Sequence, residues 1–264
     1  GLANSLGASP SSLLGENSRV KYLDLNLGVQ EHFKPTISLT NVNMISEYGN
    51  SAIFNQNSLN LHNDDQTINL GIGHRTLLND EKVILGLNLF YDHEFEQEHQ
   101  RVSLGAEYLT SVFEVYANRY ERLSEIAKYG TTTETVLDGY DVHIVGQLPF
   151  LPWGKVAYNN YNWNATGKDT QGERYSLEAQ ILRNMVFEIG QSDPETSSKE
   201  DFFKLTLRWP ANQFKQTIFT HTVSDFMFPE KNMSSKMLGK VRRTNNIVTE
   251  KTTSAGGVRI VRAS

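Results

Sequence analysis

The stretch VILGLNLFYD, residues 83–92, decides how this chain folds, because its side chains change in kind at every step. The odd-numbered positions are all large and apolar, whereas the even-numbered ones include Gly86, Asn88 and Asp92. Successive side chains of a β-strand point to opposite faces of the sheet. The stretch therefore predicts a strand with one apolar face and one mixed face.

The same alternation recurs between Val20 and Trp209, mostly in segments of 10 to 13 residues. Such segments exceed the usual strand of about 5–6 residues, but they match a tilted membrane strand of about 9–11 residues. About twelve strands are expected, over residues 20–30, 35–46, 53–62, 66–77, 82–93, 100–110, 112–123, 138–149, 154–164, 173–183, 184–192 and 200–210.

The expected connections alternate between minimal turns and longer polar loops. Residues 78–81, 110–111 and 183–184 are short turns, while residues 93–99 and 124–137 are long and polar. Membrane barrels show this asymmetry, with short turns on one rim and long loops on the outer one. The sequence therefore predicts an all-β, antiparallel, up-and-down transmembrane β-barrel.

A soluble β-sandwich or a lipocalin-like barrel is the alternative, because its strands alternate in the same way. Strand length argues against this alternative. So do aromatic residues near the expected strand ends, which suit the interfacial girdles of membrane barrels. These residues are Tyr22, Tyr91, Tyr108, Tyr140, Tyr175 and Trp209, the last of which ends the closing strand.

Composition excludes several other classes of protein. Only 38% of the residues are hydrophobic, the mean hydropathy is -0.45, and no apolar run approaches the roughly 20 residues of a spanning helix. The chain has no cysteine, which rules out disulfides, thiolate catalysis and cysteine-based zinc sites. Its seven histidines show no H-E-x-x-H spacing, and there is no G-x-S-x-G elbow. No catalytic, metal or cofactor site is predicted, and His93 and His143 are expected to be solvated or structural.

Charge divides the chain into an acidic body and a basic tail. Residues 1–210 hold 16 Lys and Arg against 27 Asp and Glu, a net charge of -11, whereas residues 211–264 hold 9 against 3, a net charge of +6. Charged side chains on the mixed strand faces are expected to line a wet lumen and to pair there. They are Asp24, Glu107, Glu114, Asp141, Glu178, Glu188, Arg75, Arg101, Arg122, Lys204 and Arg208.

The basic tail is expected to cross this acidic lumen and to end, extended, at the cell surface. Residues 229–239 have a proline at their start and a glycine at their end, which predicts a short helix there. Lys240 is expected to cross the lumen, and cysteine pairs that link it to lumen positions such as Glu107 or Glu178 would test this path. The other basic residues of the crossing are Lys231, Lys236, Arg242 and Arg243. The alternative is a flexible basic tail on the periplasmic side.

One side chain conflicts with the alternation. Arg119 shares its face with Phe113, Val115 and Ala117, which are expected to meet lipid. An arginine at the bilayer midplane costs about 2–4 kcal/mol. Arg119 must therefore lie near a rim, or the alternation slips at this position.

Several runs resemble, in order and spacing, the barrel core of the intimin/invasin family. They are NLGIGHR (69–75), GLNLFYDH (86–93), RVSLGAEY (101–108), NRYERLS (118–124), GYDV (139–142) and QLP (147–149). A further run, VRRTNNIV (241–248) with Asn245 and Asn246, resembles the Asn-rich segment that leaves the pore in that family. The resemblance covers roughly residues 18–250.

The resemblance implies a twelve-stranded barrel in the bacterial outer membrane, whose C-terminal linker returns through the lumen to present an adhesive passenger outside. The expected parts are an N-terminal periplasmic segment (1–17), the barrel (18–210) and a lumen-threading basic linker (211–264). Expected partners are outer-membrane lipids, the barrel-assembly machinery, periplasmic chaperones and, through a passenger, a host-cell receptor. No cofactor and no nucleic acid is expected.

The chain departs from the family pattern in two places, because no immunoglobulin-like passenger follows Ser264 and no peptidoglycan-binding module precedes Ser18. It is expected to be the anchor and translocator of an inverse autotransporter adhesin (type V secretion), either as a fragment or as a minimal relative. A stand-alone adhesin or pore that acts through its outer loops remains an alternative. An outer-membrane enzyme would need a nucleophile and a base at the rim, which the sequence does not offer.

Overall fold

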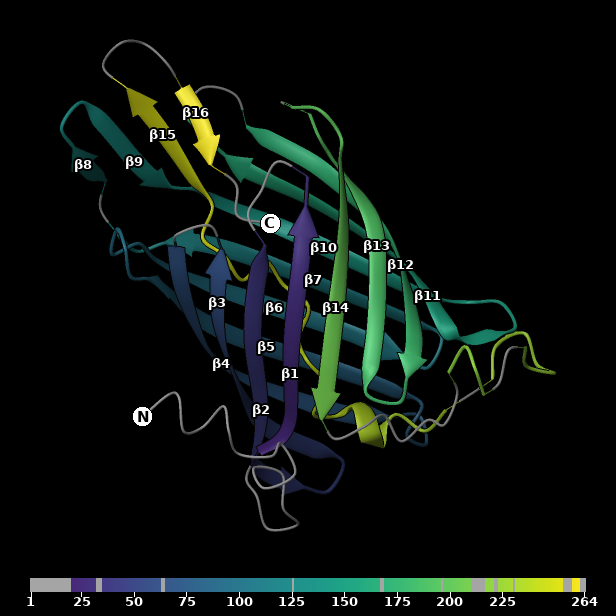
Figure 1. Ribbon diagram of the computed structural model, residues 1–264. Coiled ribbons are helices and arrows are strands. Elements are labelled where there is room, and N and C mark those ends of the chain that lie inside the picture. The colour runs from purple at the N-terminus through teal and green to yellow at the C-terminus, as the bar shows by residue number, and fades with distance from the viewer. Residues whose placement is uncertain are drawn as a thin grey trace, which may run out of the picture.

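The computed structural model describes residues 20–31, 35–62, 65–124, 126–166, 169–195, 197–209, 217–220, 223–229, 231–253 and 258–261. The expected N-terminal segment, residues 1–17, lies outside them. The main body is a closed antiparallel barrel (Figure 1). Within these ranges, no helix has the length and the apolar character needed to cross a bilayer.

Twelve strands form the ring, each paired with its neighbours along the chain, and β1 pairs with β14 to close it. At this seam Asp24 lies opposite Arg208 and Leu25 opposite Leu207. Closure gives every wall strand two partners, which satisfies backbone groups that lipid could not. The strands are β1 (Val20–Gln30), β2 (Thr36–Tyr48), β3 (Ser51–His62), β4 (Asp65–Leu78), β5 (Val83–Glu94), β6 (Gln100–Thr110), β7 (Phe113–Arg122), β10 (Asp138–Leu148), β11 (Leu151–Asn164), β12 (Thr170–Leu182), β13 (Met185–Pro194) and β14 (Glu200–Trp209).

The prediction of an up-and-down barrel of about twelve strands is confirmed. No expected strand end lies more than three residues from the observed one. The two rims also differ as expected. Asn79, Asp80 and Glu81 adopt positive φ values of 51°, 51° and 65° in the tight turn between β4 and β5. We call the rim that carries this turn the short-turn rim, and the opposite one, which carries residues 93–99, the long-loop rim.

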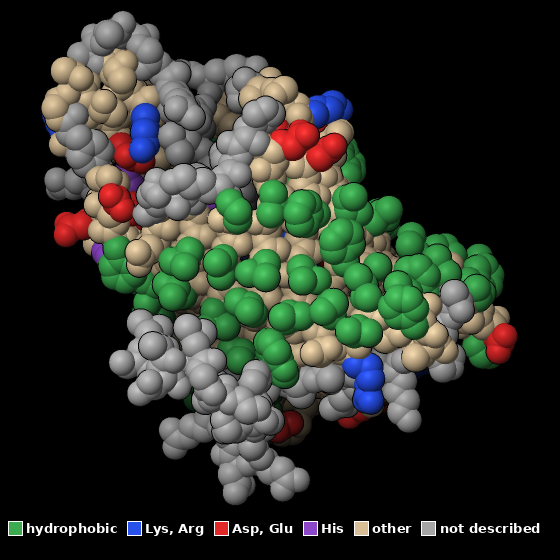
Figure 2. Space-filling model, in the orientation of Figure 1, with side chains coloured by type: hydrophobic (Ala, Val, Ile, Leu, Met, Phe, Trp, Pro, Cys, Tyr) green, Lys and Arg blue, Asp and Glu red, His purple; other side chains and the backbone are tan. Residues whose placement is uncertain are grey.

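The outer wall is apolar, and the inner face of the same strands is polar. Along β6 the side chains alternate between buried and exposed, and outward residues such as Leu87 and Leu104 are each 62% exposed. Figure 2 shows hydrophobic side chains spread across the middle of the visible wall, with charged side chains towards its margins. Such a belt suits contact with lipid rather than with water.

Arg119 keeps the phase of its strand. Its register partners Leu104 and Tyr140 are exposed on the same outer face. Arg119 lies three residues before β7 ends on the long-loop rim, and its Nε donates to Glu121 at 2.8 Å. The alternation therefore does not slip, and the arginine lies towards the rim, where it forms an exposed ion pair.

A second, smaller sheet stands beyond the long-loop rim (Figure 1). Its order is β16 (Val258–Val261), β15 (Thr249–Thr253), β9 (Thr132–Val136) and β8 (Ala127–Tyr129). Residues 124–137 were expected to form a loop, so this expectation was wrong for the residues of β8 and β9. The pairing of β9 with β15 joins segments more than a hundred residues apart, which local alternation does not reveal.

Candidate functional site

The C-terminal segment of residues 231–249, the lumen linker, crosses the barrel from the short-turn rim to the long-loop rim. At its start, the Met233 N–H donates to the carbonyl of Glu81 in a short turn, at 2.8 Å. At its end, the Leu137 N–H donates to the carbonyl of Val248, at 2.9 Å. An extended chain covers about 3.3 Å per residue, so the intervening residues suffice for an apolar belt of about 25 Å.

The helix expected over residues 229–239 is only a single 3-10 turn, Ser234–Lys236. Met233 beside this turn packs into a buried cluster with Leu77 and Ile84. From Lys240 to Val248 the linker has no helix. A helix rises only about 1.5 Å per residue, so an extended path crosses the barrel with fewer residues.

Arg75 holds the lower part of the linker. Its Nε and Nη2 donate to both carboxylate oxygens of Glu107, at 2.7 and 2.9 Å. Its Nη1 donates to the carbonyls of Met237 and Gly239, at 2.9 and 2.6 Å. The guanidinium also lies 4.4 Å from the centre of the Phe54 ring. A buried arginine of the wall thus pairs with Glu107 and also donates hydrogen bonds to two backbone carbonyls of the linker.

Arg243 is the counterpart on the linker. Its two terminal nitrogens donate to the two oxygens of Asp92, at 2.9 and 2.7 Å, and Nη2 also donates to Ser103 at 2.9 Å. Arg101 binds the same carboxylate at 2.9 and 2.7 Å. The side chains of Arg243, Asp92 and Arg101 are all fully buried, and Arg243 lies 4.3 Å from the Phe90 ring centre. Bidentate pairing of this kind fixes orientation as well as charge.

Thr244, the next linker residue, binds Asp141 through both its backbone and its side chain. The Thr244 N–H donates to Asp141 Oδ2 at 3.0 Å, and the hydroxyl donates to the same oxygen at 2.7 Å. Tyr120 and Asn118 donate to this carboxylate from β7, at 2.8 and 2.6 Å. The wall therefore holds the linker at consecutive residues.

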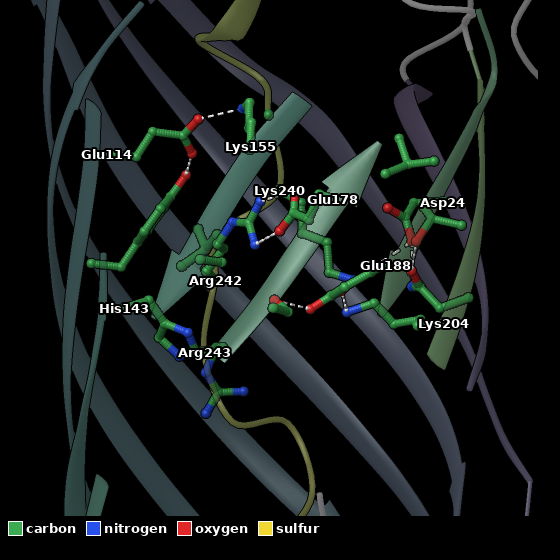
Figure 3. Close-up of a pocket in the computed structure, with 18 of the residues that line it drawn as sticks. Asp24, Glu114, His143, Lys155, Glu178, Glu188, Lys204, Lys240, Arg242 and Arg243 are labelled. Atoms are coloured by element: carbon green, nitrogen blue, oxygen red, sulfur yellow. Dashed lines mark hydrogen bonds and ion pairs between the residues drawn. The ribbon is translucent and has the colours of Figure 1, made fainter. Parts of the chain in front are cut away.

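A second set of charges faces the other side of the linker (Figure 3). Arg242 donates to both oxygens of Glu178, at 2.5 and 2.9 Å. The Lys240 Nζ lies 3.5 Å from Asp24, a lumen carboxylate other than Glu107 and Glu178, the two examples named in the sequence analysis. Glu107 pairs with Arg75, and Glu178 pairs with Arg242. The sequence alone does not indicate which cation pairs with which carboxylate.

The other charged side chains on this side of the lumen form ion pairs mostly with one another within the wall, or with the linker near the short-turn rim. Lys204 pairs with Glu188, and Arg208 lies 3.9 Å from Asp24. Glu114 accepts from Lys155 at 2.6 Å and also pairs with Lys236 of the linker. Arg122, by contrast, is exposed at the end of β7 and does not line the interior.

The other expected residues are placed as follows. The carbonyl of Asn245 accepts a hydrogen bond from Asn69 at 2.8 Å, and Asn246 is buried. Trp209 is half-buried at the end of β14, opposite Leu23 of the closing seam. His143 Nε2 lies 3.5 Å from Asp141, and His93 packs edge-on against Phe95 with ring centres 4.8 Å apart.

Apolar linker residues are the part of the site that the sequence analysis missed. Val241 is buried with Val42, Phe54 and Phe90. Val248 is buried with a second group, Tyr120, Leu137, Tyr161 and Trp163. Together with Met233 they give the linker three apolar contacts at three heights. The only sequence signal was that these residues are apolar within an otherwise polar tail.

A cavity of about 540 Å³ remains between the linker and the strands β11 to β14 and β1. Its lining includes Asp24, Lys155, Glu178, Lys204 and Arg208. The linker thus fills the β3 to β7 side of the lumen and leaves a polar, charged space on the other. Among the residues described, no three His, Cys, Asp or Glu side chains are arranged to hold a metal ion.

At the long-loop rim the linker continues into β15. The Thr249 hydroxyl donates to Glu134 of β9 at 2.7 Å, and Lys251 and His99 lie 3.2 and 3.5 Å from the same carboxylate. Burial raises the pKa of the Glu134 carboxyl, but the nearby His99 ring, the hydrogen bond from Thr249 and the charge of Lys251 outweigh it. The pKa therefore lies below its ordinary value of 4.5.

Comparisons with known proteins agree with this architecture. A family model described as "Inverse autotransporter, beta-domain" matches residues 8–245. The chain is 24% identical to the inverse autotransporter adhesin YeeJ of Escherichia coli over 252 residues, which cover 88% of this chain and 10% of YeeJ. It is 29% identical to invasin of Yersinia enterocolitica over 140 residues, which cover 50% of this chain and 16% of invasin. The chain therefore spans only a small part of the length of either relative.

Solved structures share the fold at low sequence identity. A chain from work on the in-meso crystallization of membrane proteins aligns with a TM-score of 0.73 and 19% identity, covering 88% of this chain and 100% of that one. The KdgM porin aligns with a TM-score of 0.50 and 9% identity, covering 70% of this chain and 98% of the porin. At these identities the likeness concerns the barrel fold alone.

Proposed function

Since the chain belongs to the inverse autotransporter β-domain family, we propose that it anchors an adhesin in the outer membrane and translocates the segment that follows its barrel to the cell surface. The barrel supplies the membrane anchor, and the lumen linker connects it to the displayed part. The role is one of transport and attachment, and it requires no catalytic group.

The path of the lumen linker is the observation that carries this proposal. The linker enters at the short-turn rim beside Glu81, passes Arg75 and Asp92, and leaves at the long-loop rim beside Leu137. In membrane barrels the short turns face the periplasm and the long loops face outside. A chain that follows this path has its C-terminal end outside the cell.

The docked linker is proposed to be the state reached after translocation. Its cations Lys240, Arg242 and Arg243 each lie beside a carboxylate of the wall. Removing one partner of such a buried pair leaves an uncompensated charge, which costs about 3–5 kcal/mol. The linker would therefore remain in the lumen as a plug and hold the exported part at the surface.

Assembly by the barrel-assembly machinery, escort by periplasmic chaperones and binding of a host-cell receptor are further parts of the proposal. They follow from family membership and from the names of the relatives, an adhesin and an invasin. A stand-alone pore or loop-based adhesin is the second candidate. The cavity of about 540 Å³ beside the linker favours it, because an open polar space could conduct ions.

The proposal is tested by mapping the C-terminus on cells. An epitope tag placed after Ser264 should bind antibody equally well on intact cells and after permeabilisation of the outer membrane. A tag in the β8–β9 turn at Gly130 serves as the outside control, and a tag in the turn at Asp80 serves as the periplasmic control. Binding to the Ser264 tag only after permeabilisation would contradict a surface-exposed C-terminus.

A further inference from the structure

Residues 217–220 and 223–229, the rim segment, expose large apolar side chains at the short-turn rim. Phe219 is 73% exposed, Phe226 72% and Val223 67%, and Met227 and Phe228 are also exposed. Large apolar surface of this density is unusual on a face that meets only water. The lumen linker, which follows directly, buries its own apolar residues instead.

Hydrogen bonds fix the rim segment against the barrel. The Phe150 N–H donates to the carbonyl of Met227, and the Ser224 N–H donates to the carbonyl of Phe150, both at 2.8 Å. The Ile218 N–H donates to the carbonyl of Gln180 at 3.1 Å. The segment thus bridges the β10–β11 turn and the end of β12, and its exposed phenylalanines stand at a defined place on the rim.

The lipid-facing wall is apolar up to these same turns. Val156 and Leu177 on the outer faces of β11 and β12 are 45% and 52% exposed. Phe150 in one turn and Leu182 beside the next are still 40% and 46% exposed. Figure 2 shows the hydrophobic surface continuing to the right-hand side of the molecule, where β10 ends and β11 begins in Figure 1. The exposed surface of the rim segment is therefore continuous with the wall that meets lipid.

We infer that the rim segment is an interfacial membrane anchor, whose phenylalanines enter the boundary between headgroups and acyl chains of the leaflet at the short-turn rim. Aromatic and apolar side chains on a segment at this boundary bind lipid in proportion to the area they bury. The anchor holds the chain between the end of β14 and the entry of the linker into the lumen. The inference rests on the proposed membrane location of the barrel.

Spin labelling tests the depth of the segment directly, because the chain has no cysteine of its own. Single-cysteine variants Phe226→Cys, Leu87→Cys and Lys128→Cys are labelled with a nitroxide in vesicles of phosphatidylethanolamine and phosphatidylglycerol. Leu87 marks the lipid-facing wall, and Lys128 marks water beyond the long-loop rim. Collisions with oxygen, which concentrates in lipid, are compared with collisions with a water-soluble nickel chelate.

The label at residue 226 is expected to prefer oxygen over the chelate, with a depth between those of the labels at 87 and 128. A value equal to that at residue 128 would overturn the inference while leaving the barrel in the membrane. A water-like value at residue 87 as well would instead overturn the proposed location of the barrel. Exposure to water in vesicles together with protection from thiol reagents in cells would point to a protein partner and also overturn the lipid anchor.

A second variant tests whether the anchor holds the rim segment against lipid. The triple change Phe219→Ser, Phe226→Ser and Phe228→Ser should speed tryptic cleavage after Lys231 several-fold in vesicles, because the segment no longer lies against lipid. Phe95→Ser, which alters an exposed phenylalanine of a loop at the opposite rim, should leave that rate unchanged. Equal rates in the triple variant and in the unaltered chain, with both barrels folded, would overturn the anchoring role.

Discussion

At the scale of single residues, the side chain of Arg243 is fully buried between Asp92, Ser103 and the ring of Phe90, whereas those of Lys240 and Arg242 are 23% and 28% exposed. Replacing it with alanine removes a bidentate pair inside the lumen. The carboxylate keeps Arg101 as a counter-ion, so the barrel itself should still fold. The effect therefore belongs to the docking of the linker.

Arg243→Ala should weaken linker docking by about 1.5–3 kcal/mol, the usual contribution of hydrogen bonds to a charged group, because Asp92 keeps Arg101 as its counter-ion. Hydrogen–deuterium exchange of residues 241–248 checks this, and exchange there should become faster while the wall strands stay protected. Arg119→Ala, which breaks an exposed pair worth about 0–1 kcal/mol, should change neither region. Unchanged protection of the linker in Arg243→Ala would contradict a docked arginine.

Gly71 is a wall residue that affects the linker indirectly, because it makes room for the Phe90 ring that contacts Arg243. A Cβ built at Gly71 would lie 2.2 Å from the ring of Phe90, which leans over the glycine from β5. Phe90 in turn carries Arg243 at 4.3 Å. Gly71 of the NLGIGHR run is therefore required because the Phe90 ring approaches its backbone closely. Its own φ is ordinary.

Gly71→Ala should destabilise the folded barrel by about 1–3 kcal/mol, the range for overpacking a filled site. The temperature at which the folded band is lost in detergent gel electrophoresis should fall. Gly146→Ala is the matched control, because a Cβ there meets only Val156, at 3.8 Å. Equal melting of the two variants would show that Phe90 can move aside without cost.

At the scale of elements, β15 is held to β9 by the pairing of the two strands and by the carboxylate of Glu134. Thr249 pairs with Val136 and Lys251 with Glu134, and Glu134 also accepts from Thr249 and faces His99. The pKa of Glu134 is lowered in the folded state, so its ionised form stabilises this pairing. That contribution is present above the ordinary pKa of 4.5 and is lost as pH falls below it.

Acidification should therefore loosen β15 before it affects the barrel. A spin label at Thr252→Cys should become more mobile as pH falls below about 4.5. In a chain that also carries Glu134→Gln, mobility should change much less with pH, because the titrating group is gone. An identical pH dependence in the two chains would show that Glu134 does not control this pairing.

At the scale of the whole molecule, the barrel and its linker are separable. The ring closes with β14 at Trp209, before the linker begins, and the linker contacts the wall mainly on the β3 to β7 side. The other side keeps a cavity of about 540 Å³. The twelve strands should therefore form without the linker, and the linker should decide how open the lumen is.

Deletion of residues 231–264 should leave a folded barrel and raise its single-channel conductance several-fold in planar bilayers. Deletion of residues 254–264 alone is the matched control and should leave conductance near that of the full chain, since it spares the linker. A barrel without residues 231–264 that conducts no better than the full chain would contradict a linker that plugs the lumen.

The strands could be predicted because their signal is local. In VILGLNLFYD, every second residue is large and apolar, so the sequence itself indicates which residues share a face of the strand. The turn at Asn79 to Glu81 is expected where this alternation stops. The partner of Lys240 could not be predicted in this way. Asp24, Glu107 and Glu178 all present carboxylates to one lumen, and the choice among them depends on the height and side at which the linker passes.

The sequence by itself determined the two-faced strands, their number and ends, and the separation of an acidic wall from a basic tail. All of these depend on residue types within a few positions or on a sum of charges. Only the tertiary structure decided that Arg243 shares Asp92 with Arg101, that Val241 and Val248 are buried in the lumen, and that β15 joins β9. These contacts join segments brought together by barrel closure, and closure is a property of the whole ring.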